Sequence, residues 1–313
     1  MRILVTGAAG FIGSHLAERL LGDGHSVVAL DALTDYYDPD RKRARLRQLR
    51  DQGATVWALD LAADALAPAL YGVEAVYHLA AQPGLSSDTP RSAFWRNNVR
   101  ATERLLDALS DQPSLRAFLH ISSSSVYGAD ATGREHTPPT PISAYGRTKL
   151  RAERTVRAAA DRAPWDACVL RLFSVYGPRE RPDKLIHKAL RCARAGQPFP
   201  LYDGSEEHRR SFTYVGDAVD GLMAALRHFD RCRSETLNLG APTTASTQHV
   251  LDLVGEVVGQ PLCVERVPPR DGDQRRTCAQ IQKARRLLNF SPDTSLRDGI
   301  AAEADWLARV PAG

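Results

Sequence analysis

The N-terminal segment contains the pattern that most constrains the fold. An apolar stretch from Ile3 to Val5 predicts a short strand, and the turn after it has glycines at positions 7, 10 and 13. A helical spacing of apolar residues continues to Leu21, and a second apolar stretch, 27–30, ends at Asp31. A strand, a glycine-rich turn, a helix and a strand in this order predict a parallel βαβ unit.

This turn also predicts a binding site for a dinucleotide. Residues without a Cβ atom let a pyrophosphate approach the backbone, and the N-terminus of the following helix supplies N–H donors. The spacing is GxxGxxG rather than GxGxxG. Asp31, eighteen residues beyond Gly13, would accept hydrogen bonds from a ribose diol and repel a 2′-phosphate, and Ala32 adds no positive charge. The sequence therefore favours NAD over NADP.

Strands and helices continue to alternate along the chain. Further strands are expected at 55–59, 75–79, 115–121 and 167–172, with helices at about 92–110 and from Tyr145 onward. Helices between successive buried strands imply an α/β fold, a Rossmann-type doubly wound parallel sheet with both faces covered. Ligands bind beyond the carboxyl ends of such strands. The residues expected at that edge are Gly7, Asp31, Asp60, Ala80, Ser123 and Ser174.

The alternation stops after Leu172. A loop rich in Arg and Pro covers 173–183, and a helix at about 184–195, short strands around Pro200 and Phe212, and a helix after Val215 follow. We therefore expect two parts. Residues 1–172, with about 214–240, would form the NAD-binding domain. Residues of about 173–213 and 241–313 would form a smaller α+β substrate lobe that closes over the nucleotide edge.

Ser123, Tyr145 and Lys149 are the candidate catalytic residues. Tyr145 and Lys149 are four residues apart, so on a helix they share a face. A lysine cation there is expected to lower the pKa of the tyrosine, and a serine hydroxyl opposite could bind the same substrate oxygen. This arrangement suits a general base that takes a proton from an alcohol. The alternative is an exposed Tyr and Lys at the start of a helix.

Composition excludes several other classes. Of 313 residues, 43% are hydrophobic and 25% charged, as in ordinary globular proteins, and the net charge is only +4. The basic run 41–47 lacks interleaved aromatic residues, so it predicts a solvated helix face and no nucleic-acid partner. We expect no membrane span and no signal peptide, hence a cytoplasmic protein. The five scattered cysteines include no CxxC and suggest neither disulfides nor a metal site.

The whole chain resembles the extended short-chain dehydrogenase/reductase family, and within it the nucleotide-sugar 4-epimerases and dehydratases. The resemblance rests on the glycine turn, Asp31, Asp60, Ser123, Tyr145-x-x-x-Lys149 and the Arg-Pro loop. It implies a tightly held NAD and a UDP-sugar substrate. For the cofactor it implies contacts from Gly7, Gly10, Phe11, Ile12, Gly13, Asp31, Asp60, Leu61, Leu79, Ala80, Ala81, Asn98, Tyr145 and Lys149. For the substrate it implies contacts from Ser123, Tyr202, Arg210, Arg270 and Asp273. Taken singly, Arg210 and Arg270 would be surface charges, and Tyr202 a core residue.

Departures from the family pattern indicate the chemistry. In the pattern of the 4,6-dehydratases an Asp-Glu pair occupies the positions of Ser124 and Ser125. In the related decarboxylases a Glu occupies the position of Ser125. A hydroxyl residue at Ser174, followed by Gly-Pro and then Arg181-Pro-Asp, looks like the UDP-glucuronate 4-epimerases. Ser124, Ser125, Ser174 and Arg181 would hold the carboxylate of a uronate, unless Arg181 merely braces its loop. Lys184 and Ser211 depart from the pattern of that group and leave the exact sugar open.

The expected function is 4-epimerisation of a UDP-sugar, most simply UDP-glucuronate to UDP-galacturonate. The alternatives are a 4-epimerase of a neutral or amino sugar nucleotide, a nucleotide-sugar oxidoreductase or dehydratase, and a non-catalytic NAD-binding protein. The resemblance also implies a homodimer formed through the long helices that follow Ser92 and Ile142.

Overall fold

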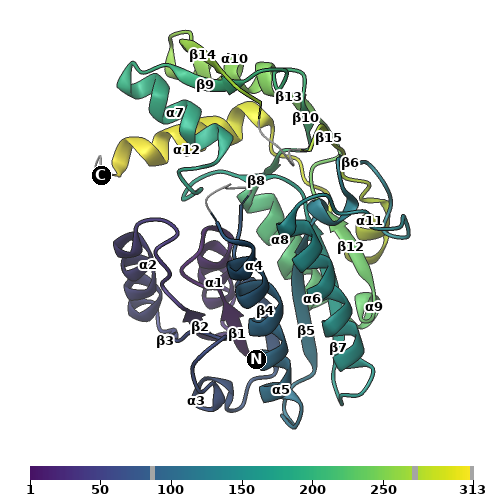
Figure 1. Ribbon diagram of the computed structural model, residues 1–313. Coiled ribbons are helices and arrows are strands. Elements are labelled where there is room, and N and C mark those ends of the chain that lie inside the picture. The colour runs from purple at the N-terminus through teal and green to yellow at the C-terminus, as the bar shows by residue number, and fades with distance from the viewer. Residues whose placement is uncertain (85–88, 270–273, 311–313) are drawn as a thin grey trace.

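The structure is a computed structural model that describes residues 1–84, 89–269 and 274–310. A seven-stranded sheet in the order β12-β7-β5-β4-β1-β2-β3 forms its base, and all of these strands pair in parallel (Figure 1). The strands are β1 (Arg2–Thr6), β2 (Ser26–Asp31), β3 (Thr55–Ala58), β4 (Ala75–His78), β5 (Ala117–Ser123), β7 (Asp166–Leu172) and β12 (Thr236–Leu239). The prediction of a Rossmann-type doubly wound sheet is confirmed.

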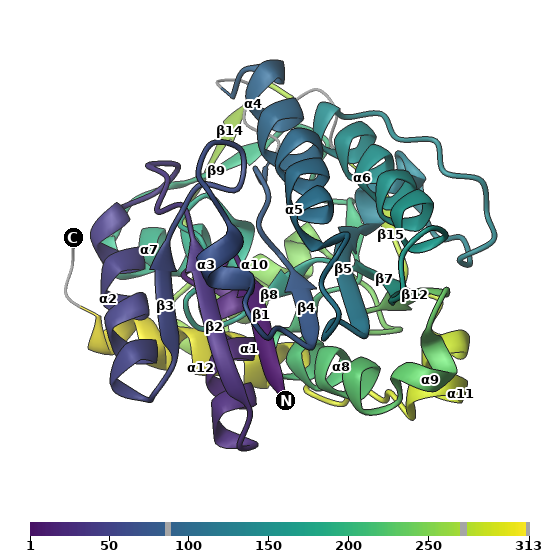
Figure 2. The same ribbon diagram turned by 90° about the horizontal axis from the view of Figure 1, so that it is seen from below.

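Helices cover both faces of this sheet (Figure 2). One face packs against α1 (Phe11–Gly22), α2 (Pro39–Asp51) and α8 (Val215–Arg227). The other packs against α3 (Ala67–Leu70), α5 (Ala101–Leu109) and α6 (Ala144–Ala160). Strand β1 shows why both faces are apolar: Ile3 and Val5 enter one core, Leu4 enters the other, and none of the three is exposed.

The helix expected at 92–110 contains an irregularity. It consists of α4 (Arg91–Trp95), a π-helical turn η1 (Arg96–Arg100) and α5. A π-helical turn accommodates one extra residue and rotates the side chains that follow it. Asn97 and Asn98 lie within this turn, beside the carboxyl edge of β4. Sequence periodicity alone gave no sign of it.

A second lobe lies above the carboxyl edge of the sheet (Figure 1). Its apolar core joins α7 (Leu185–Ala195), α10 (Thr247–Val258) and α12 (Leu296–Arg309). Its small sheets are β13-β10-β15-β6, β11-β8 and β14-β9. Their strands are β6 (Asp130–Ala131), β8 (Val175–Tyr176), β9 (Phe199–Tyr202), β10 (Arg209–Arg210), β11 (Thr213–Tyr214), β13 (Ala245–Ser246), β14 (Val264–Val267) and β15 (Arg276–Thr277).

The chain passes between the two parts more than once. Strand β6 follows β5 of the large sheet, yet it pairs with β15 of the upper lobe. Strand β12 and helix α8 return to the large sheet. Helix α9 (Phe229–Cys232) and helix α11 (Gln282–Leu288) pack beside β12, so residues 282–288, which the sequence assigns to the substrate lobe, lie with the large sheet instead.

Candidate active site

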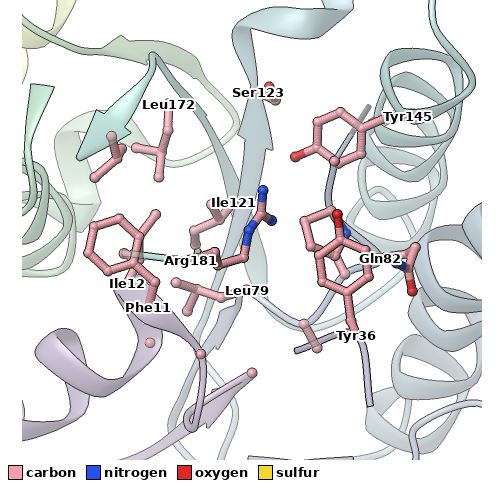
Figure 3. A pocket seen from close by; sticks show the side chains of 18 of the residues that line it. Phe11, Ile12, Tyr36, Leu79, Gln82, Ile121, Ser123, Tyr145, Leu172 and Arg181 are labelled. Carbon is pink, nitrogen blue, oxygen red and sulfur yellow. The ribbon is translucent and has the colours of Figure 1, made fainter. Parts of the chain in front are cut away.

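A cavity of about 470 Å³ lies between the carboxyl edge of the sheet and the upper lobe (Figure 3). Most of the predicted site residues line it: Gly7, Gly10, Phe11, Ile12, Gly13, Asp31, Asp60, Leu61, Leu79, Ala80, Ala81, Ser123, Ser124, Ser125, Tyr145, Lys149, Ser174, Arg181 and Arg210. Among the described residues, Asn98 and Tyr202 are the predicted members that lie outside this lining. Arg270 and Asp273 fall outside the described part of the chain.

The glycine-rich turn forms a tight cradle at the start of α1. A Cβ atom on Gly13 would lie 2.1 Å from the carbonyl oxygen of Gly7, and one on Gly7 would lie 2.9 Å from the amide nitrogen of Ala80. Gly7 also has a φ of +71°, a conformation that favours glycine. Helix α1 begins without a side-chain cap, so the first N–H groups of the helix face the cavity edge. These features fit a pyrophosphate.

Asp31 is held in place at the end of β2. Its carboxylate accepts hydrogen bonds from the N–H groups of Ala9 at 3.0 Å and Leu33 at 2.8 Å. Burial raises the pKa of Asp31, while these two bonds and the positive charges of Lys42 and Arg45 act in the opposite direction. The carboxylate is thus fixed in orientation at the edge of the cavity, which Asp31 lines.

Asp60 follows β3, and Asn97 and Asn98 of η1 lie beside the end of β4. Asp60 pairs with Arg96 at 2.5 Å and accepts the N–H of Ala62 at 2.8 Å. Asn97 lines the cavity. The side chain of Asn98, 2% exposed, accepts the N–H of Gln82 at 2.6 Å and donates to the hydroxyl of Thr148 at 3.0 Å. Asn98 therefore ties the loop after β4 to α6.

Tyr145 and Ser123 meet because α6 approaches the end of β5 very closely. Ser143 caps the helix by accepting the N–H of Gly146 at 3.0 Å. A Cβ atom on Gly146 would lie 2.4 Å from the carbonyl oxygen of Ser125. Ser123 accepts the N–H of Ser125 at 3.1 Å, and its hydroxyl is 3.2 Å from that of Ser125. In Figure 3 the hydroxyl of Tyr145 points into the cavity.

The pKa of Tyr145 differs from the expectation. Burial raises it above the ordinary value, whereas a hydrogen bond with Ser123 and the charge of Arg181 act to lower it. The prediction that Lys149 would bring the pKa of Tyr145 below its ordinary value is therefore wrong for the protein by itself. Burial acts on the lysine as well, because it lowers the pKa of Lys149 to about 8. Desolvation by burial is the largest effect on the pKa of each group.

Lys149 depends on a buried ion pair. The charge of Glu153, one turn along α6, favours the protonated lysine. Glu153 accepts two hydrogen bonds from Arg171, at 2.9 and 2.7 Å, and one from the hydroxyl of Ser122 at 2.5 Å. The guanidinium of Arg171 also lies 4.8 Å from the centre of the Tyr127 ring. A bidentate pair of this kind fixes α6 against β5 and β7.

Arg181 points into the cavity from the Arg-Pro loop (Figure 3). Its Nε and Nη2 atoms each lie 3.1 Å from an oxygen of Asp183, and its guanidinium lies 5.4 Å from the centre of the Tyr36 ring. The hydroxyl of Tyr36 donates to Asp183 at 3.4 Å. Tyr36 and Asp183 thus position the arginine, with Tyr36 reaching it from the loop after β2.

A buried acidic cluster supports the same loop from behind. Glu303 of α12 accepts the N–H of Gly177 at 3.1 Å and lies 3.4 Å from Nδ1 of His187. Glu180, which lines the cavity, accepts the N–H of His187 at 3.4 Å. Burial raises the pKa of Glu180 to about 7, and burial together with Glu180 raises that of Glu303 to about 10. Burial also lowers the pKa of His187 to about 4.

Sequence reasoning missed several residues of the cavity wall. Tyr36, Glu180 and Gln274 line it, and Gln274 donates to the carbonyl oxygen of Gly128 at 2.7 Å. No local motif marks them, because they reach the cavity from separate loops. Lys184 and Ser211, which depart from the family pattern, lie in different parts of the structure. Lys184 lines the cavity, whereas Ser211 is fully buried and bonds to the backbone of Ala241.

Within the described ranges no helix is long and apolar enough to cross a membrane. The same residues include no group of three or more His, Cys, Asp or Glu side chains placed to hold a metal ion.

The comparisons with known proteins agree with this geometry. An uncharacterised UDP-glucose epimerase of Bacillus subtilis, YtcB, is 35% identical over the full length of both chains. A probable UDP-glucuronate 4-epimerase of Rhizobium meliloti is 31% identical over 98% of this chain and 96% of its own. The crystal structure of a UDP-glucuronic acid 4-epimerase of Bacillus cereus, in complex with UDP-glucuronic acid and NAD, superposes with a TM-score of 0.94 at 33% identity and covers 99% of both chains. The profile of the NAD dependent epimerase/dehydratase family matches residues 3–240, and the chain belongs to that family.

Proposed function

We propose that the protein is an NAD-dependent UDP-sugar 4-epimerase that converts UDP-glucuronate to UDP-galacturonate. The observation that carries this proposal is the set of residues that line one cavity. Ser123, Tyr145 and Lys149 lie there with Arg181, and serines occupy positions 124 and 125. This set suits proton transfer at a sugar hydroxyl beside a bound anion.

The residues present fit NAD. The cradle at Gly7 and Gly13 has no space for a Cβ atom, the N-terminus of α1 adjoins it, and Asp31 offers a fixed carboxylate to a ribose diol. Bound NAD would accept a hydride and return it, so the reaction needs no net oxidant.

Tyr145 acts as the base in the proposed reaction. Its phenolate takes the proton of the C4 hydroxyl while the hydrogen at C4 leaves as hydride, and a 4-keto sugar forms. Ser123 orients the C4 oxygen by a hydrogen bond. The keto sugar then turns its opposite face to the same site, the hydride returns to C4, and Tyr145 gives the proton back. Glu153, held by Arg171, favours the protonated form of Lys149, and a lysine cation there would stabilise the phenolate.

A carboxylate at C6 of the sugar is the ligand we assign to Arg181. Its guanidinium would form a charge-assisted hydrogen bond, with Ser124, Ser125 and Ser174 as further donors on the same wall. Oxidation at C4 makes a uronate a β-keto acid, which loses CO₂ when the C–CO₂ bond stands parallel to the carbonyl π orbitals. Four donors that fix the carboxylate keep that bond out of alignment.

The rival functions differ in the groups they need. Elimination of water, as in the dehydratases, requires an acid and a base where Ser124 and Ser125 stand. A neutral-sugar 4-epimerase needs the same catalytic residues but has no use for a cation at Arg181. Arg181 therefore favours a uronate over UDP-glucose.

A panel of UDP-sugars tests the function. The protein, incubated with UDP-glucuronate, UDP-glucose and UDP-N-acetylglucosamine, should convert the first fastest, and NMR should follow inversion at C4 without build-up of NADH. Faster conversion of UDP-glucose would replace the uronate assignment, and NADH formed in step with product would indicate an oxidoreductase.

We also propose that the protein works in the cytoplasm as a homodimer through α5 and α6. These helices pack side by side on one face of the sheet (Figure 2). Between them lie acidic residues of α5, such as Glu103, and basic residues of α6, such as Arg151. Such a mixed surface can pair with its own copy about a twofold axis. Light scattering on the purified protein would show twice the mass of the chain, and a monomer would refute the dimer.

A further inference from the structure

Lys184 is a cavity residue that the proposed reaction does not use. It stands at the N-terminus of α7, directly before Leu185, and lines the same cavity as Tyr145. Within the described part of the chain, no hydrogen bond or ion pair involves its ammonium group, although Lys184 is half-buried. An ammonium group that lines a cavity and makes no hydrogen bond there can accept an anionic ligand.

Lys184 follows Arg181 by three residues in the chain, and both line the cavity together with Arg210. Burial lowers the pKa of Lys184, and the charges of Arg181 and Arg210 both act in the same direction. Three positive side chains therefore gather at this cavity, and Lys184 directly follows the loop that carries Arg181.

A UDP-sugar has its anionic groups in a fixed order. With C4 at Tyr145 and the sugar carboxylate at Arg181, the diphosphate comes next and the nucleoside last. Leu185 and Ile186, the first two residues of this eleven-residue helix, line the cavity beside Lys184. The N–H of His187 in the same turn donates to Glu180.

We propose that Lys184 binds the diphosphate of the substrate and sets the affinity for UDP-sugars; this inference rests on the proposed function. The group recognised is a nucleoside diphosphate rather than the sugar. Glu180, four residues earlier in the loop, also lines the cavity, and while burial lowers the pKa of Lys184, the charge of Glu180 raises it. Two negative groups therefore compete for Lys184, the carboxylate of Glu180 and the diphosphate of the substrate.

Titration calorimetry of the full-length protein with UDP at about pH 7.5 tests the proposal. Lys184→Met should weaken UDP binding by about tenfold or more, since it removes a charge-assisted contact. Lys184→Arg should retain most of the affinity. Lys188→Met is the matched control, because Lys188 lies one turn further along α7 over the ring of Phe199. It should bind UDP as the wild type does. Uridine, which has no phosphate, should bind all four proteins equally.

A double variant distinguishes diphosphate binding by Lys184 from a role in which Lys184 only neutralises the charge of Glu180. If Lys184 only neutralises Glu180, then Glu180→Gln/Lys184→Met should regain wild-type affinity for UDP, and that result would overturn the proposal. Unchanged binding in Lys184→Met would do the same. Continued weak binding in the double variant supports the diphosphate contact. Because UDP titration requires no turnover, absence of epimerase activity in the wild type would refute the proposed function and leave this test intact.

Discussion

Gly146 faces the carbonyl oxygen of Ser125 so closely that a Cβ atom between them would lie only 2.4 Å from that oxygen. This approach brings the first turn of α6 against the turn after β5. It is the reason Tyr145 and Ser123 line one cavity although they belong to different elements. The glycine inside Tyr145-Gly-Arg-Thr-Lys149 therefore fixes the relative position of Tyr145 and Ser123.

Gly146→Ala should push α6 away from Ser125. Because the obstacle is backbone, we expect a loss of stability of about 1–3 kcal/mol and a fall in kcat of at least about tenfold. Thermal unfolding and NMR assays of C4 inversion measure the two effects. Gly22→Ala is the control, since Gly22 also lies in a helix but a Cβ atom there meets nothing within 4 Å. If both variants behave alike, the packing explanation is wrong.

Tyr145→Phe should abolish nearly all turnover and leave the fold and UDP binding intact. Removal of the base costs about 10²–10⁴-fold in rate. The progress of C4 inversion and a UDP titration measure the two properties. Tyr71→Phe, at a residue that is 82% exposed, should change neither. Substantial activity in Tyr145→Phe would exclude this tyrosine as the base.

Arg181→Ala should separate the substrates. Loss of a carboxylate contact should lower kcat/KM for UDP-glucuronate by about tenfold to a hundredfold, with a much smaller effect on UDP-glucose. Asp183→Asn is a useful companion, because it keeps the shape of the residue that holds Arg181 and removes its charge. Asp183→Asn should lower kcat/KM less than Arg181→Ala does, and again more for UDP-glucuronate than for UDP-glucose. An equal loss on both substrates in Arg181→Ala would remove the carboxylate role.

The pH dependence of stability should depend on Glu303. Its pKa is raised to about 10 in the folded protein, so the neutral form is favoured there. The stabilising effect is fully present below the pKa of the unfolded chain and is lost as the pH rises from about 4.5 toward 10. Glu303→Gln keeps an oxygen for Gly177 and cannot ionise.

Glu303→Gln should therefore melt higher than the wild type at about pH 8–9, by about 5 °C or more, and close to it at about pH 5. Melting curves across this range provide the measurement. Glu256→Gln, at an exposed side chain, should follow the wild type at every pH. A parallel pH profile for Glu303→Gln and the wild type would show that Glu303 does not titrate in this window.

Local patterns predicted the parts of the site that are built locally. The glycine turn, Asp31 and the residues that end each strand follow from short-range geometry and from the rule that parallel strands share one carboxyl edge. The contact of Tyr36 with Arg181 joins distant loops, so no spacing reveals it. The prediction for the pKa of Tyr145 was wrong because burial, the largest effect on it, depends on the packed structure. Only the fold shows that Lys184 lines the cavity while Ser211 holds strands together.

The pairing of β6 with β15 has a consequence for dividing this protein into parts. A fragment that ends after β7 would keep β6 and lose its hydrogen-bonding neighbour, and it would also lack the edge strand β12. A fragment of the upper lobe alone would lose one strand of its largest sheet. Neither piece is a transplantable module. Chimeras that exchange specificity between relatives should therefore replace individual loops, such as 177–184, rather than whole lobes.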